Sequence, residues 1–123
     1  QLLQNSDNSV VGISRTQTIT HPHYQHITID LSDVNAVANF KFALHEDAKK
    51  ICLINNAGTL GNVKHVGNLQ APDIIASYNI NVIAPSVLIN TFISTYRFVS
   101  AQKIILNISS GAGKNPYDGW AVY

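Results

Sequence analysis

Short runs of β-branched residues alternate along the chain with longer stretches in which apolar residues recur at helical spacing. The runs predict strands at 10–14, 26–30, 51–54 and 103–108. The run at 51–54 is apolar without interruption, which suits a strand that is buried on both faces of a sheet. Strands that alternate with helices are typical of βαβ units, so the pattern predicts an α/β fold with a parallel sheet.

Two helices are expected between these strands. The first follows an N-cap at Ser32 or Asp33 and continues to about residue 42, whereas 16–24 is a polar connection with little helical character. The second spans about 72–98, and Pro85 should kink it because proline removes one helical hydrogen bond. The residues of this helix that we expect to be buried are Ile75, Tyr78, Val82, Leu88, Ile89, Phe92 and Tyr96.

Composition restricts the classes of partner. The 123 residues are 46% hydrophobic and 12% charged, which suits a folded domain, and the formal net charge is +1. That charge gives no reason to expect nucleic acid or a membrane as a partner, and no continuous apolar run approaches the length of a membrane span. The single cysteine, Cys52, is expected to be a buried small residue of a cytoplasmic protein. His21, His23 and His26 alternate without a carboxylate or thiol partner, so no metal site is expected.

Polar residues gather where each predicted strand ends. In open α/β sheets, ligands bind at the carboxyl ends of the strands, so these positions predict a binding site. The positions at these strand ends, polar and apolar together, are Ser14, Arg15, Asp30, Leu31, the segment Asn55-Asn56-Ala57-Gly58, Ser109 and Ser110. The segment 55–58 is also compatible with an ordinary strand-to-loop turn that uses asparagine and glycine for their unusual dihedral angles.

Ser110 and Tyr123 are candidates for chemistry on a carbonyl group. A tyrosine hydroxyl becomes a usable proton donor when a cation lies near it. A serine hydroxyl beside it can hydrogen-bond the same carbonyl oxygen and hold it for attack. Taken singly, Ser110 would be a turn residue and Tyr123 a core aromatic. Tyr117 and Trp120 indicate either an aromatic pocket near Tyr123 or simple packing.

Residues 10–123 resemble the classical short-chain dehydrogenase/reductase family. The matching pieces, in the family's order, are Asn55-Asn56-Ala57-Gly58, Asn81, Asn107-Ile108-Ser109-Ser110 and Tyr123. Ser110 precedes Tyr123 by thirteen residues, as in the family. Segment 107–123 is most similar to the bacterial benzil reductases, and Gly119-Trp120-Ala121 is shared with sepiapterin reductases. The resemblance implies a Rossmann-type doubly wound parallel sheet and an oxidoreductase that reduces a ketone or diketone to an alcohol by hydride transfer from NADPH.

The resemblance also implies roles for single residues. Tyr123 would donate the proton to the carbonyl, and Ser110 would orient and polarise it. Asn81 would hold a water in the proton relay, although alanine replaces the family's glycine three residues later. The alternative for Asn81 is a polar residue that satisfies backbone groups near Pro85. The cofactor would be lined by Asn56, Ala57 and Gly58, and Asp30 and Leu31 would meet the adenine edge unless Asp30 is a helix cap.

Arg15 favours NADP over NAD. An acidic residue at the end of the second strand of this fold accepts hydrogen bonds from the ribose hydroxyls of NAD. The predicted strand 10–14 corresponds to that second strand, and it ends in Ser14-Arg15-Thr16, without an acid. A guanidinium at this point can pair with a 2′-phosphate. The alternative is a solvated surface arginine.

Two parts of the family pattern fall outside residues 1–123: the glycine-rich turn after the first strand and the lysine four residues after the catalytic tyrosine. We therefore expect 1–123 to be one partial NADP-binding domain, truncated at both ends, and inactive as a reductase by itself. By resemblance, the partners would be a small carbonyl substrate and further copies of the chain in a homodimer or homotetramer. The competing hypotheses are a catalytically inactive dinucleotide-binding sensor or interaction module and a flavodoxin-like domain that binds flavin.

Overall fold

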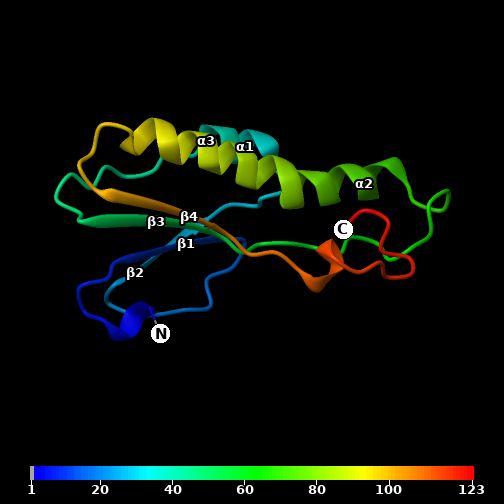
Figure 1. Ribbon diagram of the computed structural model, residues 1–123, viewed down its shortest axis with the longest axis horizontal. Helices are drawn as coiled ribbons and strands as arrows, with labels where there is room; N and C mark the ends of the chain where they lie inside the picture. Colours follow the sequence, from blue (N-terminus) through cyan, green and yellow to red (C-terminus); the bar gives the residue numbers. More distant parts are fainter. Residues whose placement is uncertain (1) are drawn as a thin grey trace.

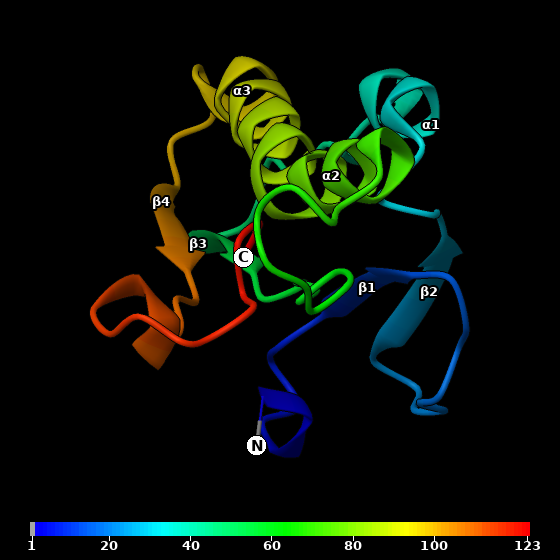
Figure 2. The same cartoon turned by 90° about the vertical axis from the view of Figure 1, so that its right-hand side faces the viewer.

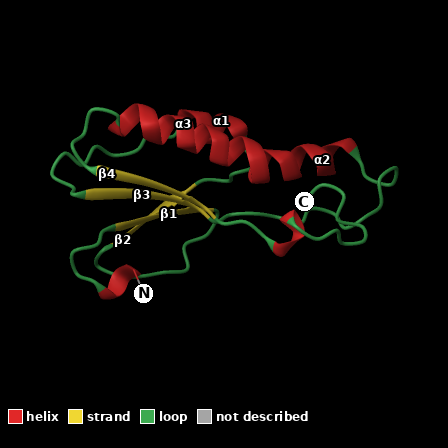
Figure 3. Ribbon diagram, viewed as in Figure 1, coloured by secondary structure: helices red, strands yellow, loops and turns green. Residues whose placement is uncertain are grey.

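The strands form two parallel pairs beneath one layer of helices (Figure 1). The computed structural model describes residues 2–123. Strand β1 (Val10–Ser14) pairs with β2 (Tyr24–Thr28), and β3 (Lys50–Asn55) pairs with β4 (Gln102–Asn107). All four strands run toward the same end of the molecule, where the connecting loops gather (Figure 3). The α/β fold with parallel strands is confirmed, and β1 has the predicted bounds.

The second strand lies two residues earlier than predicted. It begins at Tyr24 because the parallel register with β1 pairs Val10 with Tyr24 and Ser14 with Thr28. Asp30 therefore lies in the turn after the strand rather than at its last position. The connection between β1 and β2 contains no helix, as its polar composition predicted.

Helix α1 (Val34–Asn39) begins at the predicted cap but ends early. The Asp33 carboxylate accepts hydrogen bonds from the backbone N–H groups of Asn35 and Ala36, each at 3.0 Å. These bonds satisfy donors that the first turn of a helix leaves free. The chain turns extended at Phe40, so Phe42 reaches the core from a loop and not from the helix as expected.

The long helix contains a π-helical turn. Helix α2 (Ala71–Tyr78) passes into the turn η2 (Asn79–Ile83) and then into α3 (Ala84–Tyr96). The backbone N–H of Ala84 donates to the carbonyl of Asn79, five residues back, which defines the wider turn. The irregularity thus precedes Pro85, the second residue of α3, which has no backbone N–H to donate.

Only part of the expected buried face of this helix is buried. Leu88, Phe92 and Tyr96 lie in the core and Ile89 lies at its margin. The prediction was wrong for Ile75, Tyr78 and Val82, which are about half exposed. Apolar residues occur on both sides of the helix, so the pattern alone does not select the buried side. The side that packs inward carries the small residues Ser77 and Ala84, which allow close approach.

By length and composition alone, the continuous helix 71–96 could cross a membrane. In this fold it packs against α1 and β3 and supplies the core.

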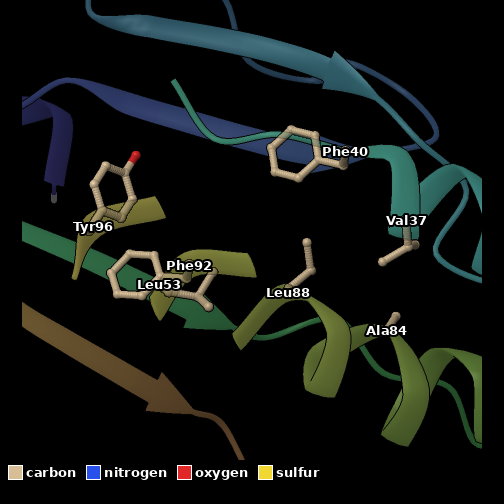
Figure 4. Close-up of a cluster of buried hydrophobic side chains, with 7 residues drawn as sticks. All are labelled: Val37, Phe40, Leu53, Ala84, Leu88, Phe92 and Tyr96. Carbon is tan, nitrogen blue, oxygen red and sulfur yellow. The ribbon is translucent and has the colours of Figure 1, made fainter. Parts of the chain in front are cut away.

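The core lies between the helices and one face of the strands. Phe92, Leu53 and Val37 meet there from α3, β3 and α1 (Figure 4). Phe92 contacts the rings of Phe42 and Tyr96 edge-on, with centroids 5.7 and 5.1 Å apart. Such T-shaped pairs add to the free energy gained from burial. The Tyr96 hydroxyl donates to the carbonyl of Ala43 at 2.6 Å, so its buried polar group is satisfied.

Within residues 2–123, no α-helix covers the opposite face of the strands, and only the short 3-10 helix η1 (Leu2–Gln4) lies on that side (Figure 2). Ile54 and its pairing partner Leu106 are 41% and 46% exposed there. Cys52, two residues from Ile54 and on the same face of β3, is also exposed. The expected burial of this strand on both faces, and of Cys52 with it, is therefore wrong for the described residues.

A tyrosine lies across β1 on this open face. The hydroxyl of Tyr24 is so close to Gly12 that an added Cβ would lie 2.0 Å from it. The same hydroxyl is 3.2 Å from Nδ1 of His26, two residues along β2. Only glycine leaves room for this side chain at position 12.

Candidate functional site

Four of the predicted site residues meet at the carboxyl ends of β1 and β2. The backbone N–H of Ile29 donates to the carbonyl of Ser14 at 3.2 Å, which holds the two strand ends together. The Asp30 carboxylate accepts hydrogen bonds from the backbone N–H and hydroxyl of Ser32, at 2.9 and 2.7 Å. These bonds, and the nearby charge of Arg15, hold the pKa of Asp30 below its usual value. Arg15 is exposed, and Leu31 packs against the margin of the core.

The Asn55–Gly58 segment lies at the end of β3, beside β4. The Asn55 amide donates to the side-chain oxygen of Asn107 at 2.8 Å and so joins the last residues of the two strands. Asn56, Ala57 and Gly58 are exposed. A Cβ on Gly58 would meet only the Asn81 side-chain oxygen, at an ordinary 3.6 Å. Within the described chain this stretch of backbone is open to a ligand.

Asn81 lies in the π-helical turn, and its side chain binds the loop after Gly58. Its Oδ1 accepts a hydrogen bond from the backbone N–H of Thr59 at 2.9 Å, and its Nδ2 donates to the Thr59 carbonyl at 2.8 Å. A π-helical turn changes the direction of side chains locally and is frequent at functional sites. Asn81 therefore fixes the start of the loop that runs from Gly58 to Gly67.

In the described chain, Ser110 and Tyr123 are not brought together by a hydrogen bond, and Ser110 is not among the residues that line the cavity beside Tyr123. The Ser110 hydroxyl oxygen accepts a hydrogen bond from the Ala112 N–H at 3.3 Å and caps the short turn η3 (Gly111–Gly113). Tyr123 is 46% exposed, and its ring meets Trp120 edge-on with centroids 5.5 Å apart. Among residues 2–123, no hydrogen bond joins Ser110 to Tyr123.

Tyr123 lines a cavity of about 530 Å³ between two loops. One loop follows β3 and is drawn green in Figure 1, and the other is the red segment near residue 123. A parallel β-bridge between Lys64 and Trp120 holds them together. Trp120 also stacks on Tyr117, with centroids 4.7 Å apart. The expected aromatic surroundings of Tyr123 are present, together with polar residues from both loops: His65, Asn115 and Asp118.

A second, smaller cavity of about 250 Å³ lies at the ends of β3 and β4. Asn55, Ala57, Asn81 and Asn107 line it, together with apolar residues of the long helix. The structure thus separates the predicted residues: Tyr123 belongs to the aromatic cavity and Asn81 to the asparagine-lined one.

Sequence reasoning missed His65 and Asp118. His65 Nδ1 lies 3.5 Å from a carboxylate oxygen of Asp118 across the two loops. No local spacing in the sequence connects the two residues, because tertiary contacts such as the Lys64–Trp120 bridge bring their loops together. Among residues 2–123, no group of three histidine, cysteine, aspartate or glutamate side chains is placed to hold a metal ion.

Comparison with known proteins identifies the family. The family model described as short chain dehydrogenase matches residues 3–123. The chain belongs to the short-chain dehydrogenase family. Among the relatives of this short-chain dehydrogenase, the (S)-benzoin-forming benzil reductase of Bacillus cereus is 37% identical over the whole of this chain and 54% of its own length. Sepiapterin reductase of Xenopus laevis is 33% identical over 76% of this chain and 38% of its own. The chain spans about half the length of the benzil reductases it matches.

Solved structures confirm the Rossmann-type fold of the family. A short-chain dehydrogenase/reductase from Burkholderia vietnamiensis has a TM-score of 0.82 at 27% identity, over 99% of this chain and 60% of its own. A metagenomic short-chain oxidoreductase solved in complex with NADP has a TM-score of 0.65 at 27% identity, over 82% of this chain and 46% of its own. The predicted family, with its benzil and sepiapterin reductase relatives, is confirmed.

Proposed function

We propose that this short-chain dehydrogenase is an NADPH-dependent carbonyl reductase that converts a ketone or diketone to an alcohol by hydride transfer. The observation that carries the proposal is the position of Tyr123, the family's proton donor by resemblance, on the wall of a cavity lined by Tyr117 and Trp120. A volume of about 530 Å³ is within the range of small-molecule sites. The similarity to benzil reductases supports an aryl ketone as substrate.

Each polar residue of the site has a role that its contacts allow. The exposed Tyr123 hydroxyl would donate a proton to the substrate's carbonyl oxygen. Ser110 uses its oxygen as an acceptor from Ala112, which leaves its O–H free to donate to the same carbonyl. Asn81 would act as a positioning residue, because both ends of its amide are committed to the Thr59 backbone.

The exposed residues at the strand ends fit a dinucleotide cofactor. Ser14, Arg15, Asp30 and Leu31 would hold its adenosine end, and the open backbone of 56–58 would lie along its middle. Arg15 makes no salt bridge within residues 2–123, so its guanidinium is available to a 2′-phosphate. The NADP bound to the metagenomic relative supports this choice. When bound, the nicotinamide supplies the hydride.

Replacement of Tyr123 tests the proposal. In the full-length protein, Tyr123→Phe should lower kcat/KM for an aryl diketone by about 10²- to 10⁴-fold, because it removes the general acid. The dissociation constant of NADPH, measured by calorimetry, should not change. Tyr24→Phe is the matched control, because Tyr24 lies on β2 far from the cavity and its loss should leave turnover intact. For the wild type, KM should be lower for NADPH than for NADH.

Two outcomes would contradict parts of this proposal. Retained turnover in Tyr123→Phe would refute the assignment of the proton donor. Tight NADPH binding by the wild type, with no turnover of any ketone, would favour the dinucleotide-binding sensor instead.

The exposed side of the long helix supports a homodimer or homotetramer. Ile75, Tyr78, Val82 and Ile93 lie at helical spacing along it and are 58%, 53%, 46% and 54% exposed. Exposed apolar residues that gather on one side of a helix favour an interaction surface on a protein in water, although Ser86 and Asn90 interrupt the series here. Light scattering on the full-length protein should give the mass of two or four chains, and the mass of one chain would contradict this proposal.

A further inference from the structure

The aromatic cavity has a polar side that the chemistry of Tyr123 does not use. Tyr117, Trp120 and Tyr123 supply its aromatic surface, whereas His65 and Asp118 supply ionisable groups. In the proposed reaction one carbonyl oxygen of the substrate is protonated, and Tyr123 is the cavity residue that serves it. The second polar group therefore requires a separate explanation.

The two residues before His65 contact the loop that carries the aromatic residues. The bridge from Lys64 to Trp120 fixes the residue before it to the aromatic loop. Gly119 takes the left-handed conformation, with φ of 73°, and a Cβ there would approach Val63 to 3.1 Å. The backbone of the two loops is thus in close contact beside His65. A side chain on this framework is preorganised to meet a ligand in the cavity.

The contact with Asp118 occupies only one of the two ring nitrogens of His65. Nδ1 lies 3.5 Å from the carboxylate, and the two side chains are 67% and 90% exposed. Exposed pairs of this kind stabilise a fold very little. The contact involves Nδ1 alone, so the other ring nitrogen is left for a ligand. Within residues 2–123, the side chain of His65 makes no other polar contact.

We propose that His65 is a specificity-determining residue, which binds a second oxygen of the substrate while Tyr123 serves the reacting carbonyl. The inference rests on the proposed function and narrows its substrate to an aryl ketone that carries a second oxygen, as a carbonyl or a hydroxyl. The aryl group would lie against Trp120, and the second oxygen would bind the nitrogen of His65 that does not face Asp118. A ketone without that oxygen gains nothing from His65.

Two ketones and three variants of the full-length protein test this inference. The ketones are a diaryl 1,2-diketone and the matched diaryl ketone in which a CH₂ group replaces one carbonyl. His65→Leu should raise KM for the diketone about 3- to 10-fold, the range expected for one lost hydrogen bond, and leave KM for the other ketone unchanged. The value of kcat should change little for both. His65→Gln, whose side chain can still form a hydrogen bond, should keep KM for the diketone close to the wild-type value. His45→Leu is the control, because His45 is exposed and lines neither cavity.

The outcome depends on how the change in KM caused by His65→Leu differs between the two ketones. An equal rise in KM for both would show that His65 only supports the loop, and no rise for either would show that it does not touch the substrate. Both results would overturn the inference. Calorimetry gives the dissociation constants of the two ketones from the complex of the protein with the cofactor, and these can be compared in the same way. An enzyme that reduces neither ketone contradicts the proposed function, whereas one that reduces both without dependence on His65 contradicts only this inference.

Discussion

The two aromatic clusters of the molecule resemble each other in geometry and differ in exposure. In the core, Phe42, Phe92 and Tyr96 meet with centroids 5.1 to 6.1 Å apart, and Phe92 and Tyr96 are 1% and 3% exposed. In the cavity, Tyr117, Trp120 and Tyr123 meet at 4.7 and 5.5 Å, but both tyrosines are about half exposed. Ring contacts at similar distances are thus buried in one cluster and leave ring surface open to the solvent in the other.

Truncation of one ring in each cluster should show this difference. Phe92→Ala should lower the free energy of unfolding by about 3–5 kcal/mol, because it leaves a cavity in a packed core. Trp120→Ala should lower the free energy of unfolding by about 1 kcal/mol, the value of its half-buried ring contacts, and should raise KM for an aryl ketone. Urea unfolding and steady-state kinetics of the full-length protein measure both effects. Equal losses of stability would mean that the cavity cluster is also part of the core.

The pH dependence of stability is a smaller effect that distinguishes Tyr96, the buried tyrosine of the core, from the half-exposed tyrosines of the cavity. Burial raises the pKa of Tyr96 above its usual value near 10. The folded state therefore holds this proton more tightly than the unfolded chain does. The resulting stability is complete below pH of about 10 and is lost as the pH rises through the raised pKa of the folded state.

Tyr96→Phe tests this pH dependence. The variant should lose about 1 kcal/mol at pH 7, because it lacks the hydrogen bond to the Ala43 carbonyl. Its stability should then fall less steeply than that of the wild type above pH 10, as measured by urea unfolding. Tyr117→Phe, which changes a half-exposed ring, is the control. A decline in Tyr96→Phe as steep as in the wild type would exclude Tyr96 as the group responsible.

Local patterns in the sequence were enough for the strands and for the positions of the family's motif. Hydrophobic runs placed β1 and β3, and the cap at Asp33 followed from a single side chain. The buried side of the long helix could not be predicted, because it has apolar residues on both sides and packs through Ser77 and Ala84. Pro85 indicated an irregularity but not the π-helical turn that precedes it.

The site was predictable only where it follows a strand or a known motif. Ser14, Asp30 and Asn55 could be placed because the carboxyl ends of parallel strands share one edge. His65 and Asp118 could not, because they lie on separate loops whose contact depends on a tertiary bridge. Ser110 and Tyr123 were predicted as a pair, but within residues 2–123 no hydrogen bond joins them and Ser110 does not line the cavity that Tyr123 lines.

The close approach of Tyr24 to Gly12 limits how this chain can vary. A side chain at position 12 would overlap the tyrosine hydroxyl, so the Tyr24 ring would have to turn away or be replaced by a shorter residue. The two positions lie on paired strands and are in contact, so the effects of substitutions at them on stability should not be additive. A side chain at position 12 is therefore tolerated to the extent that the residue at position 24 gives way, whereas position 24 can be shortened by itself.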